Sequence, residues 1–257
     1  MKYFKITFIC FISLVFCFSS AYSQTNDLEA FAKFFDAGTS YKQEDYHKAI
    51  ELYEEILHTG LESGELYYNL GNSYLKVKKL GKAVLNYERA RMLLPRDSDL
   101  ESNFSFALSM VGNQRVSTKP SFLHRFIHGY SDQFTLNELT VILFGLLLFM
   151  GILYLSCLFL KCSSKVLFSS LIVLGLAFLS HVFFLSDKIY YENNYAIALN
   201  KADSKFEPIE GATIHFVLPE GGKAQILKEK DGWIKIRRPD GKEGWSKKNT
   251  LEKIHNR

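Results

Sequence analysis

The sequence predicts a multidomain membrane protein. It should consist, in chain order, of an all-α module of helical hairpins, a two-helix transmembrane hairpin and a small all-β barrel. Three observations predict it. Two uncharged apolar stretches lie near the middle of the 257 residues, a 34-residue period precedes them, and short strand-like segments separated by glycine turns follow them. On either side of the apolar stretches the chain is long enough for one small domain.

Residues 1–23 have the features of a secretory signal peptide. Lys2 and Lys5 begin it, an apolar stretch follows, and Ala21 and Ser23 provide a small-residue cleavage site. An uncleaved anchor is the alternative, and both versions export the next segment. All four cysteines lie in the signal or the apolar hairpin. We therefore expect no disulfide framework, thiol nucleophile or cysteine metal site in the exported parts.

A 34-residue period relates residues 30–63 to residues 64–97. The second copy has small, aromatic and helix-ending residues at eight positions of one register: Tyr67, Leu70, Gly71, Tyr74, Ala83, Tyr87, Ala90 and Pro95. This length and pattern resemble the helix–turn–helix tetratricopeptide repeat. Two repeats bury too little apolar surface alone, so we predict a capping helix in 97–111 with a buried face of Leu100, Phe104, Ala107 and Leu108. The predicted repeat domain is 28–112.

The first helix of each predicted repeat should line an inner face that binds a protein partner. Its candidate residues are Phe34, Tyr41, Tyr68, Asn69, Asn72 and Lys76, with Phe35 and Lys42 beside them. Asn69 and Asn72 are similar to the asparagines with which some tetratricopeptide repeats clamp a peptide carboxylate. The first copy lacks the matching basic and asparagine positions. An aromatic and polar surface for a protein partner is therefore the favoured hypothesis.

Residues 113–138 are predicted to form a linker and an interfacial helix. His124 and His128 have a spacing that can bind zinc on a helix, but a polar face in water above the membrane is the favoured interpretation. No metal or other cofactor is therefore predicted. Thr135 and Glu138 have the spacing of a capping box that starts the first spanning helix.

The stretches 139–160 and 166–186 should form two membrane-spanning helices. A helix of this length covers roughly 32 Å, enough for the hydrocarbon core of a bilayer. The loop 161–165 has two lysines and no acidic residue, which predicts that it stays in the cytoplasm. Both flanking domains should then lie outside the cytoplasm, on the exported face of the bacterial inner membrane. His181 is expected near the exported end, hydrogen-bonded to the neighbouring helix.

Residues 190–257 change to strand-like patterning and predict a small, highly curved barrel. The five expected strands are 196–199, 213–218, 224–228, 233–237 and 243–246. Turns with Gly221, Gly232 and Gly241 separate them, and such turns often need a positive φ.

The sequences Asp-Gly-Trp-Ile-Lys-Ile at 231–236 and Gly-Lys-Glu-Gly-Trp at 241–245 resemble the second half of bacterial SH3-type domains. Both tryptophans of the chain, Trp233 and Trp245, belong to this pattern. They either fill the barrel and its rim or contact a ligand. The acidic, tyrosine-rich opening of eukaryotic SH3 domains is missing, so proline-rich peptide binding is not implied. Bacterial relatives often bind cell-wall peptides or partner proteins.

The whole arrangement resembles the BatE proteins of the Bacteroides aerotolerance operon. The resemblance implies a membrane subunit that works beside other Bat proteins, some with von Willebrand factor A domains, in envelope integrity or tolerance of oxidative stress. It therefore favours a protein–protein interaction scaffold, and peptidoglycan binding is the alternative.

Other classes of function are disfavoured by the residues. The net charge of +4 is modest and does not indicate nucleic-acid binding. An enzyme would need a nucleophile or a clustered Ser, His and Asp set, and His215 is expected at a strand edge instead. A transmembrane sensor would lack an output domain, because the cytoplasmic loop has only five residues.

Overall fold

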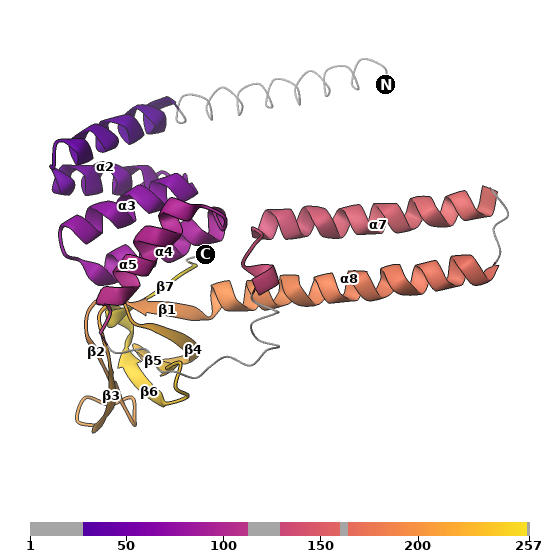
Figure 1. The fold of residues 1–257 in the computed structure, drawn as a ribbon. Coiled ribbons are helices and arrows are strands. Elements are labelled where there is room, and N and C mark those ends of the chain that lie inside the picture. The colour runs from indigo at the N-terminus through magenta and orange to yellow at the C-terminus, as the bar shows by residue number, and fades with distance from the viewer. Residues whose placement is uncertain (1–27, 113–128, 160–163, 256–257) are drawn as a thin grey trace, which may run out of the picture.

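The computed structural model describes residues 28–112, 129–159 and 164–255 (Figure 1). They form a helical domain, a long hairpin of two helices and an antiparallel β-domain. The predicted signal peptide at 1–23 lies outside the described residues. So do most of the predicted interfacial helix, including His124 and His128, and most of the loop between the apolar stretches.

The helical domain is built from consecutive antiparallel helices. They comprise residues 28–42, α2 (Tyr46–His58), α3 (Gly64–Lys76), α4 (Leu80–Leu93) and α5 (Ser98–Met110). Side chains of Asp45, Ser63 and Asp97 accept hydrogen bonds from backbone N–H groups in the first turns of α2, α3 and α5. Each cap satisfies a donor that has no partner within its helix, so the sequence itself marks where these helices begin.

Tyrosines fill the core of the helical domain. Tyr53, Tyr74 and Tyr87 are at most 1% exposed. Gly71 allows α3 and α4 to cross closely, because a Cβ there would lie 2.8 Å from the ring of Tyr87. The predicted helix after residue 97 exists as α5 and covers the open end of the core. One residue of its predicted buried face is wrong, since Leu108 is 44% exposed.

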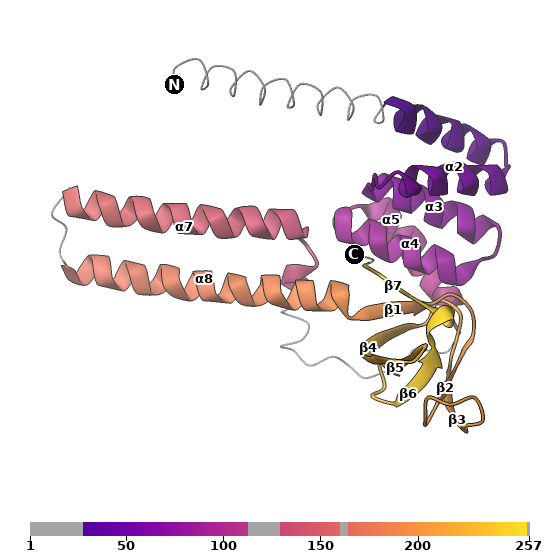
Figure 2. The same cartoon turned by 180° about the vertical axis from the view of Figure 1, so that it is seen from behind.

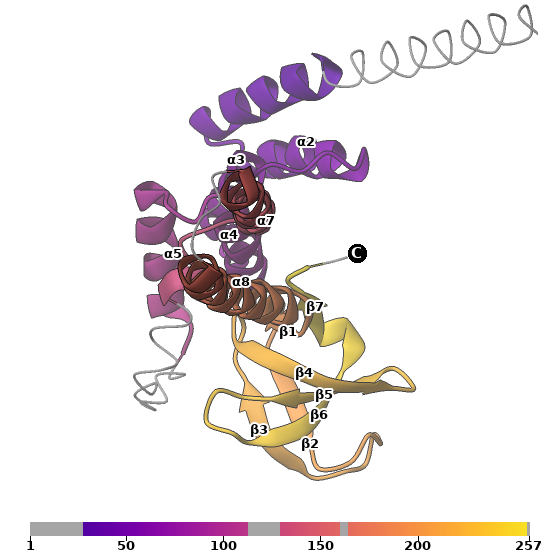
Figure 3. The ribbon, with the colours of Figure 1, turned by 90° about the vertical axis from the view of Figure 1, so that its right-hand side faces the viewer.

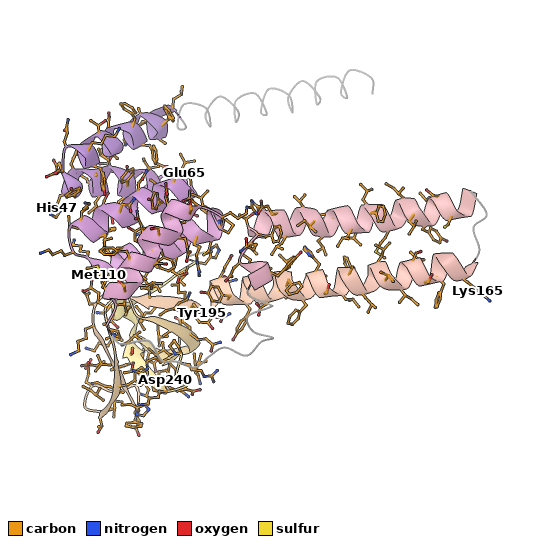
Figure 4. All side chains as sticks on the ribbon, viewed as in Figure 1. His47, Glu65, Met110, Lys165, Tyr195 and Asp240 are labelled. Atoms are coloured by element: carbon orange, nitrogen blue, oxygen red, sulfur yellow. The ribbon has the colours of Figure 1, made fainter. Side chains whose placement is uncertain are left out.

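The two apolar helices α7 (Leu136–Phe159) and α8 (Ser164–Asn193) lie side by side and extend away from both domains (Figures 1 and 2). Both are long and apolar enough to cross a membrane. Lys165 lies at the end of the hairpin far from the domains (Figure 4).

The predicted features at the near end of the hairpin are confirmed. Thr135 Oγ1 accepts from the Glu138 amide, and Glu138 accepts from the Thr135 amide, which completes the capping box. A ring nitrogen of His181 lies 2.9 Å from the carbonyl oxygen of Leu139. Helix α8 continues to Asn193, well past residue 186, where the predicted span ends.

The β-domain is a highly curved antiparallel sheet. Its strands are β1 (Tyr195–Ala198), β2 (Ala202–Lys205), β3 (Ile214–Leu218), β4 (Lys223–Lys230), β5 (Trp233–Arg237), β6 (Glu243–Lys247) and β7 (Leu251–Lys253), in the order β3-β2-β6-β5-β4-β1-β7. Gly221, Gly232 and Gly241 have positive φ, as their turns predicted. The predicted number of five strands is wrong, because β2 and β7 are too short and too polar to show a clear alternating pattern.

The β-domain docks on helix α4 (Figures 2 and 3). Ile197 of β1 and Ile254, which follows β7, are 0% and 1% exposed and complete the core of the helical domain. A Cβ at Gly81 would lie 2.4 Å from the carbonyl oxygen of Leu199, so only glycine permits this approach. The Gly81 amide also donates to the Glu220 carboxylate at 2.9 Å. The two domains therefore share one core.

A buried charge cluster joins the same two domains. Glu88 of α4 is 4% exposed and accepts hydrogen bonds from Lys223 at 2.7 Å and from Arg91 at 3.1 Å. Burial alone raises a carboxyl pKa, but the attraction of Lys223 and Arg91 outweighs it, so the pKa of Glu88 lies below its usual value. Nearby, Arg89 donates to Glu252 at 2.8 Å and to two backbone carbonyl oxygens at the C-terminal end of the chain.

Two further contacts attach the hairpin to the domains. Arg96 of the α4–α5 connection donates to Glu138 in the first turn of α7 and to the Gln133 carbonyl oxygen. Tyr195 begins β1 where α8 ends, so α8 enters the β-domain directly (Figure 4). The hairpin, the helical domain and the β-domain are thus held together at one end of the apolar helices.

Candidate interaction surfaces

The first surface is centred on the side chain of Asn72 in α3. Its Oδ1 atom accepts a hydrogen bond from the Tyr87 hydroxyl at 2.7 Å and from Asn103 Nδ2 at 3.0 Å. Asn103 also donates to the Tyr68 hydroxyl oxygen at 2.8 Å. Burial raises the pKa of Tyr87, so its phenol stays protonated and keeps donating. The amide NH2 of Asn72 and the O–H of Tyr68 remain as donors for a ligand.

The other residues predicted for this surface differ in how accessible they are to a partner. Phe34 packs edge-on against Tyr53, with ring centroids 5.6 Å apart, and is half-buried. Tyr41 packs on Tyr46 in the same way, with centroids 5.2 Å apart. Both aromatics therefore act first as core residues, which weakens their prediction as contact residues.

Asn69 and Lys76 remain better placed for contact. Asn69 is half-buried on α3, and Lys76 is exposed with its ammonium group 5.9 Å from the centre of the Tyr46 ring. The structure brings Tyr68 and Asn72 together through Asn103, which the sequence reasoning missed. The signal for Asn103 was present, because α5 follows the second repeat where the first helix of a third repeat would lie.

The helical domain also exposes three aromatic side chains. Phe31 and Phe35 on the first helix are 72% and 70% exposed, and Phe106 on α5 is 59% exposed. Contiguous exposed apolar patches mark interaction sites, whereas single exposed apolar residues are common. Only Phe35 of these three was expected on the inner face.

The second surface lies on the β-domain, around Trp245 of β6. Trp245 is half-buried and pairs across the sheet with Lys235 of β5 and Lys205 of β2. Trp233 is only 9% exposed, and the ammonium of Lys205 lies 5.5 Å from the centre of its ring. The strand register places both tryptophans on the same face of β5 and β6, where neighbouring side chains such as Lys205 cover Trp233. Trp245 is therefore the tryptophan that a ligand can reach more easily.

The loop 206–213, between β2 and β3, adds apolar surface beside Trp245. Phe206 and Ile209 of this loop are 59% and 54% exposed, and Ile214, the first residue of β3, is 48% exposed. His215 of β3 stacks near Phe206, with ring centroids 4.3 Å apart, and occupies an edge strand as predicted. The sequence reasoning missed this loop, because its apolar residues have no regular spacing.

The lysines around Trp245 are paired with carboxylates. Lys235 contacts Glu243 at 2.8 Å, and Lys247 contacts Glu210 at 2.8 Å. Hydrogen bonds from Lys235 and Arg237 lower the pKa of Glu243, so this carboxylate is ionised at neutral pH. The second surface is therefore apolar with balanced charge at its rim, and it suits an uncharged or weakly charged ligand.

Within the described parts of the chain, no group of three or more His, Cys, Asp or Glu side chains is arranged to hold a metal ion. The two surfaces offer hydrogen-bond donors, aromatic rings and apolar side chains, which suit binding.

Comparison with known families identifies the β-domain. Residues 207–252 match the bacterial SH3 domain family. The match includes Trp233, Trp245 and most of the exposed loop. No match to the chain is found among curated proteins. Bacterial SH3 domains serve as protein-interaction or peptidoglycan-binding modules, so the Trp245 surface of this SH3 domain is a candidate ligand site.

Proposed function

We propose that this protein is a membrane-anchored, non-catalytic scaffold that presents two interaction modules on the exported side of the bacterial inner membrane. The helical domain binds a protein partner through the surface around Asn72. The SH3 domain binds a second partner or the cell wall through the surface around Trp245.

The helical domain is proposed to be a pair of tetratricopeptide repeats with a capping helix. Its helix pairs recur with the 34-residue period of the sequence. The crossing of α3 and α4 at Gly71, with the ring of Tyr87 against it, supports the same assignment.

The contacts between the two domains support the proposed sidedness. Arg89 and Glu252 are 2.8 Å apart, although the apolar helices lie between them in sequence. If α7 and α8 cross the membrane once each, both domains lie in one compartment. The lysines of the 161–165 loop favour the cytoplasm for that loop, which leaves the exported side for both domains.

One observation carries the proposal: the domains are docked through α4, β1 and β7, while the Asn72 and Trp245 surfaces stay open. The resemblance to BatE proteins suggests Bat-type membrane subunits with von Willebrand factor A domains as partners, in a complex that supports envelope integrity or aerotolerance. The donors around Asn72 suit backbone carbonyls or a carboxylate of such a partner.

The test is crosslinking of the full chain in membranes, followed by identification of the crosslinked proteins. Asn72→Asp keeps the acceptor oxygen for Tyr87 and Asn103 but replaces the free NH2 donors with a charge. We expect this variant to lose the partner, whereas Gln43→Glu, the same isosteric change at an exposed turn, retains it. Equal crosslinking by both variants, or recovery of no defined partner, contradicts the proposal.

Peptidoglycan binding is the second candidate, favoured by the match of 207–252 to bacterial SH3 domains. Purified peptidoglycan should then sediment the detergent-solubilised full chain. Trp245→Ala should abolish sedimentation, and Phe106→Ala, which removes an exposed aromatic from the helical domain, should not. If the wild-type protein stays in the supernatant, peptidoglycan binding is rejected. The Trp245 surface is then assigned to a protein partner.

A further inference from the structure

A cavity of about 420 Å³ lies where the helical domain, the hairpin and the C-terminal end of the chain meet. Apolar side chains from two helices form part of its wall, including Leu57 of α2 and Leu93 of α4. Arg89, Glu62 and Glu252 supply charged groups to the same wall. A water molecule in the liquid occupies about 30 Å³, so the cavity is much larger than a single water needs. It can therefore admit a polar group of several atoms.

The cavity lies at the level of the lipid headgroups. Its wall includes Thr135, Leu136 and Asn137, the first turn of α7. The candidate membrane span begins in this same turn, at Leu136, so the wall lies where the hydrocarbon core meets the headgroup layer. The headgroup layer is about 5–8 Å thick on each side of the hydrocarbon core. A group that enters this cavity from the bilayer is therefore a lipid headgroup.

The charges of the wall suit a ligand that has both signs. Arg89 uses Nε and Nη2 for Glu252 and backbone carbonyl oxygens, and no hydrogen bond within the described residues occupies its Nη1 atom. That donor can bind a phosphate oxygen, and the positive end of the α7 dipole favours the same charge. Glu62 adds a carboxylate to the wall, which favours a cation. Arg89 does not balance this carboxylate, because it already pairs with Glu252.

We propose that this cavity holds the headgroup of a membrane phospholipid that carries a phosphate and a primary ammonium, as in phosphatidylethanolamine. The phosphate contacts Arg89 and the start of α7, and the ammonium contacts the carboxylate of Glu62. The assignment rests on the proposed insertion of the hairpin into a membrane, but not on the scaffold partners.

A primary ammonium fits this wall better than a quaternary one. An ammonium has three N–H donors for carboxylate oxygens, whereas a choline group has none and is recognised by cages of aromatic rings. Among the described residues, Tyr67 is the one Phe, Tyr or Trp side chain in the wall. Phosphatidylcholine is therefore the matched ligand that should bind more weakly.

The test is native mass spectrometry of the full chain in detergent, titrated with phosphatidylethanolamine, phosphatidylcholine or phosphatidylglycerol of identical acyl chains. Reconstitution of the full chain into bilayers is measured first, so that failed insertion is separated from failed lipid binding. We expect one phosphatidylethanolamine to be retained about tenfold more tightly than the other two lipids, which corresponds to about 1.4 kcal/mol. Equal retention of all three overturns the proposal.

Variants locate the lipid. Leu93→Trp fills the cavity and should lower phosphatidylethanolamine retention about tenfold. Leu108→Trp is the control, because Leu108 is 44% exposed on α5 while Leu93 is 41% exposed in the cavity wall. Glu62→Gln should reduce the preference over phosphatidylcholine without unfolding the protein.

Two outcomes would reject the assignment in different ways. Equal losses with Leu93→Trp and Leu108→Trp would place the bound lipid elsewhere. Soluble phosphoethanolamine that binds as tightly as the lipid would reassign the cavity to a soluble metabolite.

Discussion

The SH3 domain has two sides that differ in how they are used. One side, formed by β1, β7 and the start of β4, is closed on α4, where Ile197 is fully buried and Lys223 pairs with the buried Glu88. The other side exposes Phe206 and the edge of Trp245 to solvent. The difference indicates that the docked side is structural and the open side is available for a ligand.

The helical domain repeats this division. Its α4 face is covered by the SH3 domain, whereas the polar cluster around Asn72 remains open on α3 and α5. Covering one face of each domain orients the open faces relative to the membrane hairpin. A mutation on a docked face should therefore cost stability, and one on an open face should cost binding.

The largest loss of stability is expected from Lys223→Met. It leaves the Glu88 carboxylate buried with Arg91 as its remaining cation, and removing one partner of a buried ion pair costs about 3 kcal/mol or more. Urea denaturation of the detergent-solubilised chain measures the loss. The double variant Glu88→Gln/Lys223→Met should recover part of it. A double variant as unstable as Lys223→Met alone would show that the pair is not the cause.

The next largest effect is expected from Gly81→Val, which forces α4 away from the backbone at Leu199. Such overpacking costs about 2 kcal/mol. Limited proteolysis should then cleave near Leu199, whose backbone packs against α4 in the native protein. Ser105→Val, at an exposed position of α5, is the matched control. Protection of Gly81→Val equal to that of the control would show that the docked face is not required for the native structure.

A smaller loss is expected from Asn72→Ala. It removes the acceptor of the buried Tyr87 hydroxyl and one acceptor of Asn103, which costs about 1–2 kcal/mol. Asn72→Asp keeps the acceptor and should be more stable than Asn72→Ala in thermal unfolding. If Asn72→Asp is the less stable of the two, Asn72 does not act as an internal acceptor.

Acid should weaken the docked interface, because Glu88 must stay ionised to pair with Lys223 and Arg91. The folded pKa of Glu88 lies below its usual value of 4.5, so its contribution to stability is complete above that pH and is lost as the pH falls through the folded pKa. The free energy of unfolding should therefore fall below about pH 5. In Glu88→Gln the slope should be shallower, and identical slopes in the two proteins would exclude Glu88 as a cause.

The smallest effect on stability is expected on the open side. Trp245→Ala should change the free energy of unfolding by about 1 kcal/mol or less, because the residue is half-buried at the surface. Trp233→Ala should cost more, since Trp233 is 9% exposed. Thermal unfolding compares them, and a larger loss for Trp245→Ala would mean that Trp245 belongs to the core.

Local patterns were sufficient to predict the elements that carry their own signal. The small residues at Gly71 and Ala83, the capping box at Thr135 and the glycine turns at Gly232 and Gly241 all have short-range physical causes. The helices, the apolar hairpin and most of the strands followed from them. The strands β2 and β7 could not be predicted, since their pairing partners rather than their own residues define them.

The contacts between the domains could not be predicted either. Gly81 has no special role within α4 and becomes necessary only when Leu199 approaches it. Glu88 and Arg89 belong to the predicted second repeat but find their partners, Lys223 and Glu252, on the far side of the hairpin in sequence. Long-range packing also covers Trp233 and leaves Trp245 more exposed, although the two tryptophans lie on the same face of β5 and β6.

Labelling of single cysteines in cells tests the central claim that both domains lie together on the exported side. With the native cysteines replaced, Ser105→Cys and Lys230→Cys place exposed thiols on the helical and SH3 domains, and Lys165→Cys marks the far end of the hairpin. A membrane-impermeant maleimide should label the first two in cells with a permeabilised outer membrane, and the third only after lysis. Labelling of just one of the two domain positions before lysis would contradict the account.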